Sequence, residues 1–192
     1  MGTLPLGVDQ PPAPSFNRRM STIAHYFRAT EATLESLRGK TNWIDILQSS
    51  PELRAQLVDV DKAVFGLEWL LSRRPAPALD TAAVGFSMRG NLAGRLMGGG
   101  GEKEPSLRSP MGPGRTLSPA LVREFEAWLR PVDLATLQPL FNAAAMMDDD
   151  VYPQDWDEPG ILEEYLVSYL DVLKVFFARA AAENQSILMF FL

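Results

Sequence analysis

Apolar side chains recur at helical spacing in two long segments, residues 60–71 and residues 161–180. Residues three and four positions apart lie on the same face of a helix, so both segments predict amphipathic helices with one buried face. Asp59 and Asp61 stand at the start of the first segment, where the positive end of a helix dipole stabilises carboxylates. We expect these two helices to supply much of the hydrophobic core.

Two shorter apolar runs lack helical spacing and predict β-strands. Residues 23–27 combine apolar and aromatic side chains, whereas residues 187–192 are apolar throughout. A strand that is apolar on both faces needs cover on both sides, so the 187–192 strand is expected inside a sheet rather than at its edge. Residues 82–86 predict a further strand.

Several helices are expected to begin at residues that cap helices well. The side chains of Thr30, Ser50 and Ser118 can each accept a hydrogen bond from a first helical turn, and proline follows both serines. A further helix is predicted over residues 134–147. Pro139 predicts a kink or break in it, because proline has no amide hydrogen.

The order of these elements predicts an α+β fold, with a small mixed sheet that includes the C-terminal strand and is covered by several helices. Residues 1–19 contain four prolines and no periodicity, and they predict an extended N-terminal tail. Residues 20–192 are expected to form a single domain. Within it, residues 88–116 are rich in glycine and proline and predict a long irregular loop.

The composition excludes several kinds of catalytic and metal site. The 192 residues include no cysteine and one histidine, His25, which excludes disulfides, thiol nucleophiles and most zinc sites. His25 lies among apolar residues of a predicted strand, a position typical of a structural histidine. No apolar run is long enough to span a bilayer. We therefore expect a cytoplasmic protein without a bound cofactor or metal ion.

Charge is distributed unevenly along the chain, whose net charge is −6. No lysine or arginine occurs between Arg130 and Lys174, and this stretch holds ten acidic residues. The other 18 basic and 14 acidic residues leave the rest of the chain mildly basic. The acidic balance argues against direct binding of nucleic acid, whose phosphates need basic partners.

The acidic residues concentrate in a predicted loop over residues 148–160. A solvated loop is the simplest interpretation. Among functional ones, a partner-binding surface is favoured over a metal or catalytic site, because the spacing is not that of an EF-hand. Trp156 either packs onto the body of the protein or contacts the partner, and the neighbouring Tyr152 and Pro153 favour packing. The residues expected to form this surface are Asp148, Asp149, Asp150, Asp155, Trp156, Asp157 and Glu158.

Three segments occur in an order that is typical of a known family. They are Val58–Ala63 leading into Gly66-Leu67 and Leu70-Leu71, then Gly112–Pro119, then Tyr152–Asp157 followed by the long aromatic helix and the terminal apolar strand. Together they resemble the bacterial YfbM-like family, a domain family of unknown function, over residues 20–192. Family members tend to have Trp-His before the glycine of the first segment, where this chain has Val64-Phe65. The resemblance implies an α+β domain of bacterial origin and supplies no reaction.

A small domain without catalytic apparatus and with a concentrated acidic loop is typical of a module that binds another protein. We expect a non-enzymatic protein, most concretely an immunity protein that neutralises a bacterial toxin of the nuclease or ADP-ribosyltransferase type by covering its basic cleft. One alternative is an enzyme, or a binder of a small ligand or divalent metal ion, that uses the 148–164 loop with residues 88–116 as a lid. Another is a structural homo-oligomer.

Overall fold

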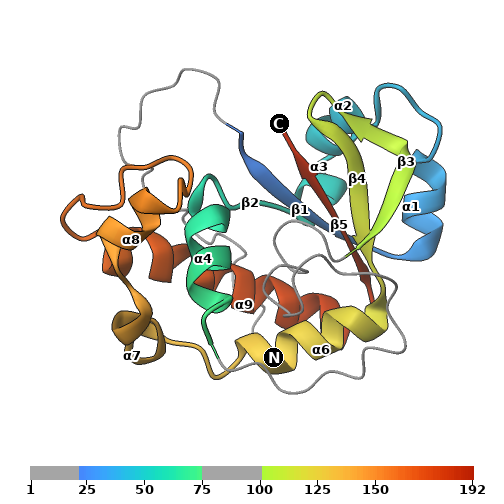
Figure 1. Ribbon diagram of the computed structural model, residues 1–192. Helices are drawn as coiled ribbons and strands as arrows, with labels where there is room; N and C mark the ends of the chain where they lie inside the picture. Colours follow the sequence, from blue (N-terminus) through green and yellow to red (C-terminus); the bar gives the residue numbers. More distant parts are fainter. Residues whose placement is uncertain (1–21, 75–100) are drawn as a thin grey trace.

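The computed structural model describes residues 22–74 and 101–192 (Figure 1). The strands in these residues form one five-stranded sheet in the order β2-β1-β5-β4-β3, with helices around it, so the predicted α+β fold is confirmed. All four strand pairs are antiparallel, whereas a mixed sheet was predicted. In each pair, the second strand starts at the end of the sheet where the first strand finishes, so the two strands run in opposite directions. The predicted tail and the predicted 82–86 strand lie outside the described residues.

The C-terminal strand is the central strand of the sheet, as the sequence predicts. It pairs with β1 on one side and with β4 on the other, and nearly all of its residues are buried. Burial on both faces explains why it is apolar throughout. The strands are β1 (Ala24–Ala29), β2 (Leu57–Asp59), β3 (Glu102–Ser109), β4 (Gly112–Leu117) and β5 (Ser186–Phe191).

The helices begin at the caps that the sequence predicts. Thr30, Ser50 and Ser118 each accept a hydrogen bond from the backbone amide three residues further on. The predicted 134–147 helix is broken near Pro139 into two short helices and a 3-10 turn. None of the helices in the described residues is long and apolar enough to cross a membrane. The helices are α1 (Glu31–Leu37), α2 (Trp43–Ser49), α3 (Pro51–Arg54), α4 (Ala63–Leu71), α6 (Pro119–Leu129), α7 (Leu134–Leu137), the 3-10 turn η3 (Gln138–Leu140), α8 (Ala143–Asp148), the π-helical η4 (Ile161–Leu166) and α9 (Val167–Ala182).

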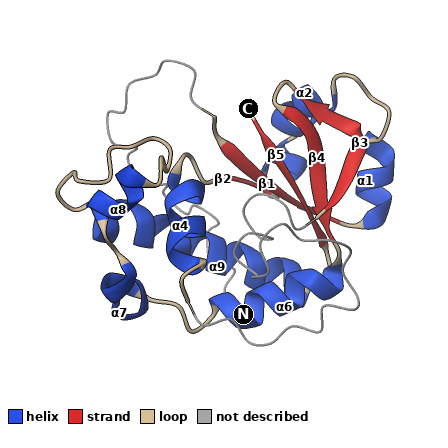
Figure 2. Cartoon of the chain, in the orientation of Figure 1, coloured by secondary structure: helices blue, strands red, loops and turns tan. Residues whose placement is uncertain are grey.

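The sheet separates two hydrophobic cores. Side chains alternate along β5, so Ile187 and Met189 join the larger core while Leu188 and Phe190 join the smaller one. The larger core lies under α4, α6 and α9, and the smaller one under α1 and α2. Figure 2 shows these two sets of helices on opposite sides of the strands. Both cores therefore depend on the central strand.

The predicted 88–116 loop is wrong for its described part, because residues 102–117 form the β3–β4 hairpin. Glycine and proline are compatible with these strands for local reasons. Pro105 lies in edge strand β3, where the pairing register shifts between Glu104 and Arg108 and an amide hydrogen is not needed. A Cβ atom at Gly114 would lie 2.8 Å from the side chain of Leu188, so the close approach of β4 to β5 requires glycine. Residues 88–100 lie outside the described residues.

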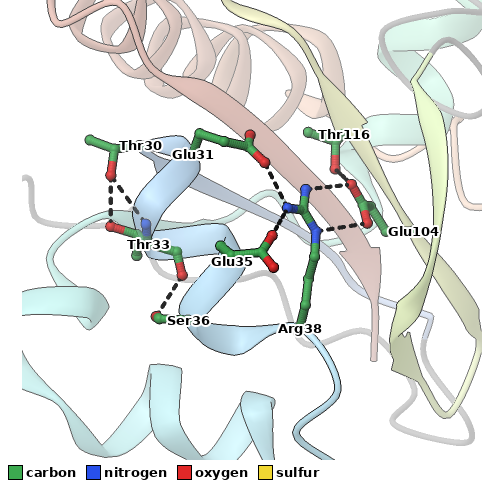
Figure 3. Close-up of polar contacts among 8 residues, drawn as sticks. All are labelled: Thr30, Glu31, Thr33, Glu35, Ser36, Arg38, Glu104 and Thr116. Carbon is green, nitrogen blue, oxygen red and sulfur yellow. Dashed lines mark hydrogen bonds and ion pairs between the residues drawn. The ribbon is translucent and has the colours of Figure 1, made fainter.

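Arg38 links α1 to this hairpin (Figure 3). Its guanidinium donates hydrogen bonds to both carboxylate oxygens of Glu104, over 3.1 and 3.4 Å, and also to Glu31 and Glu35. Glu104 in turn accepts a hydrogen bond from the Thr116 hydroxyl. The three carboxylates raise the pKa of Arg38 above its usual range. The network joins α1, which covers the smaller core, to the edge strand β3.

Candidate functional site

The acidic loop, residues 148–160, joins α8 to η4 and lies beside α4. Figure 1 shows it in orange, on the side of the molecule away from the β3–β4 hairpin. Asp148, Asp150, Asp157 and Glu158 are exposed, and Asp155 is half-buried. The loop therefore presents most of its carboxylates to solvent, as the sequence predicts.

Trp156 fixes this loop to the body of the protein. Its side chain is 1% exposed, and its Nε1–H donates a hydrogen bond of 2.8 Å to the carbonyl oxygen of Val151. The packing interpretation is confirmed. The inclusion of Trp156 among the partner-binding residues is wrong, because a ring so deeply buried offers no surface to a partner.

Two of the three segments that carry the family resemblance meet at this point. The Trp156 ring packs on Gly66 of α4, and a Cβ atom there would lie 2.6 Å from Cη2 of the ring. Phe65 and Tyr152 form an edge-to-face pair with ring centres 5.4 Å apart. The ammonium of buried Lys62 lies 5.7 Å from the centre of the Tyr152 ring. The first and third segments therefore build one junction between α4 and the acidic loop.

Asp149 is an exception among the loop acids, because it takes part in the structure of the junction. Its Oδ2 accepts hydrogen bonds of 2.8 Å from Nε1 of Trp69 and from the Arg73 guanidinium. The Arg73 guanidinium also stacks on the indole, with Cζ 3.2 Å from the ring centre. Because Arg73 compensates the charge of Asp149, Asp149 contributes less to the negative charge of the loop than the neighbouring acidic residues do.

A surface pocket of about 530 Å³ opens between α4 and the loop. Its size lies within the range of small-ligand sites. None of the described residues of the predicted 88–116 lid lines it. The described residues that line it are Phe65, Glu68, Trp69, Ser72, Arg73, Asp149, Asp150, Val151 and Tyr152. Sequence reasoning missed this pocket, because its two walls are about 80 positions apart in the chain.

Asp59 and Asp61 lie just before α4, as the sequence predicts, and each also accepts a hydrogen bond there. Asp59 ends strand β2, and its Oδ1 accepts a hydrogen bond from the backbone amide of Asp61. Oδ2 of Asp61 accepts a hydrogen bond of 2.9 Å from the Tyr165 hydroxyl. Burial, reinforced by these carboxylates, raises the pKa values of Tyr165 and Tyr169 above their usual range. The two aspartates thus tie the start of α4 to the π-helical turn.

His25 packs against the central strand and has the Asp59 carboxylate nearby. The His25 ring stacks on Phe190 with centres 5.2 Å apart, and its buried Nδ1 has no hydrogen-bond partner there. Burial lowers its pKa, although the nearby Asp59 carboxylate opposes this shift. In residues 22–74 and 101–192, no three acidic or histidine side chains gather as metal ligands do.

Comparison with known proteins identifies a family and a fold. Residues 20–190 match a family described as a domain of unknown function, DUF1877. The crystal structure of YfbM from Escherichia coli, a protein of unknown function, is similar with a TM-score of 0.61 and 14% sequence identity. The match covers 88% of this chain and 99% of that one, and at this identity it shows a shared fold. No curated protein matches the chain.

Proposed function

The chain belongs to the DUF1877 family, a domain of unknown function, and we propose that it binds another protein through the acidic loop without catalysing a reaction. The partner presents a basic surface. In the most specific form of the proposal, the protein is an immunity protein of the bacterial cytoplasm. It then neutralises a toxin of the nuclease or ADP-ribosyltransferase type by covering the basic cleft in which the toxin holds its substrate.

The observation that carries this proposal is a set of exposed carboxylates on an anchored loop. Asp148, Asp157 and Glu158 are exposed, and no lysine or arginine occurs from residue 131 to residue 173. Trp156 holds the loop against α4, so binding costs less conformational entropy than it would for a free segment.

Charge complementarity explains why such a loop suits a partner that acts on nucleic acids or nucleotides. A cleft that binds phosphates is lined by lysine and arginine. An acidic loop is attracted to that cleft over several ångströms, which accelerates association and opposes unsuitable partners. The same loop repels nucleic acid itself.

The test begins with capture of the partner from the native bacterium and its identification by mass spectrometry. Its affinity is then measured by calorimetry for the wild type and for a variant with Asp148→Lys, Asp157→Lys and Glu158→Lys. We expect the triple variant to bind more weakly by on the order of a hundredfold, with a smaller dependence of affinity on salt.

A matched control has the same change in net charge at exposed acids elsewhere, Asp45→Lys, Glu102→Lys and Glu124→Lys. The control should bind the partner with nearly wild-type affinity. Equal losses in the two variants would show that only total charge matters, and an unchanged affinity in the acidic-loop variant would overturn the proposal.

A further inference from the structure

Arg74, just after the end of α4, carries a charge that no carboxylate of the described residues compensates. Its side chain is half-buried, yet it takes part in none of the ion pairs among these residues. By contrast, the buried Arg28 pairs with Glu183. A charge that is partly removed from water costs free energy unless an opposite charge lies beside it. Burial accordingly lowers the pKa of Arg74, and no carboxylate opposes that shift.

The side chain of Trp128 lies beside this guanidinium. Cζ of Arg74 lies 5.2 Å from the centre of the indole ring, and Nη1 donates a hydrogen bond of 3.4 Å to the carbonyl oxygen of Trp128. The face of the ring and a carbonyl near the end of α6 both attract a cation. Each of them offers only a partial negative charge, so the full charge of Arg74 remains uncompensated.

Trp128 contributes a second donor that lacks an acceptor. The residue is 7% exposed, and its buried Nε1 has no hydrogen-bond partner. The three other tryptophans of the chain, Trp43, Trp69 and Trp156, each donate from Nε1 to an oxygen atom. A buried indole N–H normally has an acceptor, and an orphaned one calls for a physical explanation.

A negatively charged acceptor would satisfy both groups at once. A water molecule would accept the indole hydrogen bond but would leave the charge of Arg74 uncompensated. A carboxylate has two oxygens, which suit the forked donors of a guanidinium and keep lone pairs for the indole N–H. Its single charge also matches the single charge of Arg74, whereas a phosphate group carries more charge than this site compensates.

We propose that Arg74 and the indole N–H of Trp128 together bind a carboxylate group where the end of α4 meets the end of α6. A small organic acid and a carboxylate side chain of another protein would use the same two contacts. Neither residue belongs to the acidic loop, so the site does not depend on the proposed function.

Titration of the full chain, labelled with ¹⁵N, with acetate tests the site directly, because the indole N–H is itself the reporter. Trp128→Phe identifies its NMR signal among those of the four tryptophans. We expect this signal to move downfield and to saturate as the N–H gains an acceptor, with a dissociation constant in the millimolar range. Sodium chloride at the same ionic strength should not reproduce the shift. Phosphate should bind no more tightly than acetate, and tighter binding of phosphate would overturn the choice of a carboxylate.

Two variants locate the binding site. Arg74→Gln removes the charge and keeps a polar side chain, and it should weaken acetate binding at least about tenfold. The matched control, Arg130→Gln, removes an exposed guanidinium that pairs with Glu126 near the same end of α6, and it should leave acetate binding unchanged. The dispersion of the amide spectrum shows whether each variant is folded. Absence of a saturable shift, an equal shift with chloride, or equal binding by the Arg74→Gln variant would each overturn the inference.

The captured partner distinguishes the two sources of the carboxylate. If the partner supplies it, acetate should compete with the partner, and Arg74→Gln should weaken the partner's affinity. If the ligand is a small organic acid, the Arg74→Gln variant should keep its affinity for the partner while losing acetate. Both results support the carboxylate site. The acetate titration uses the isolated chain, so its outcome is independent of whether the acidic loop binds a partner.

Discussion

The indole of Trp156 lies so close to Gly66 that a Cβ atom at residue 66 would fall 2.6 Å from Cη2 and 2.7 Å from Cζ3 of the ring. The side chain of Leu166 closes the same space at 2.9 Å. Helix α4 thus contacts both the acidic loop and η4 around a residue without a side chain.

Gly66→Ala should therefore destabilise the protein although alanine favours helices. The added methyl group forces the indole or the helix to shift, which costs about 1–3 kcal/mol in a packed core. Urea denaturation followed by tryptophan fluorescence measures the change in the free energy of unfolding.

The same substitution should cost less in a Trp156→Phe background, where the ring that meets the methyl group is smaller. We expect a coupling of about 0.5–3 kcal/mol between the two positions in a double-mutant cycle. Strictly additive effects would contradict direct contact between the methyl group and the indole.

Arg38→Met should loosen the attachment of α1 to the hairpin. The methionine keeps an apolar stem, but Glu104, whose side chain is 15% exposed, loses its charged partner. Because the Arg38 side chain itself is 25% exposed, solvent moderates the loss, and we expect about 1–2 kcal/mol. Arg54→Met, at an exposed position of α3, is the control. Equal stabilities of the two variants would show that the network of Figure 3 is energetically neutral.

His25→Phe should change how stability depends on pH. The folded protein holds the pKa of His25 below its ordinary value of 6.5, so below this value the unfolded chain binds more protons and wild-type stability falls. The phenylalanine variant keeps the ring against Phe190 and lacks this titration. Unfolding curves at about pH 5.5 and 7.5 should show that acidification costs the wild type more than the variant. The same loss in both proteins would contradict a depressed pKa.

Tyr165→Phe should destabilise the junction between α4 and the π-helical turn. The hydroxyl donates to Asp61, whose backbone lies in the left-handed region with φ of 47°. Without this hydroxyl, the Asp61 carboxylate loses a hydrogen bond that helps to hold Asp61 in this conformation. We expect the free energy of unfolding to fall by about 1–2 kcal/mol. Thermal unfolding measures the loss. Tyr152→Phe is a control, because it removes a hydroxyl from the same region and keeps the ring against Phe65.

Local chemistry explains which parts of the fold could be predicted. The caps at Thr30 and Ser118 act within one helical turn, so four neighbouring residues contain the whole signal. The central position of β5 follows from its own apolar composition. The strand β2 is only three residues long, too short for an alternating pattern to appear.

The hairpin and the pocket depend on contacts that no local pattern reveals. Gly114 is suited to a strand only because Leu188 lies against it. The bond from Trp69 to Asp149 joins residues 80 positions apart, and neither residue type indicates the other. The charge of the loop follows directly from its sequence. Its anchoring depends on the packing of Trp156 on Gly66, a contact between residues that are far apart in the chain.

The position of β5 has a consequence for how the chain folds during translation. The ribosome makes this strand after every other described strand, yet β1 and β4 hydrogen-bond to it and not to each other. The two parts of the sheet therefore emerge without the strand that joins them, and each exposes an edge that can pair with another chain. Those edges stay unpaired until residues 186–191 have been made. The order in which the strands are made therefore differs from their order in the sheet, and the sheet is complete only after residue 191 has been made.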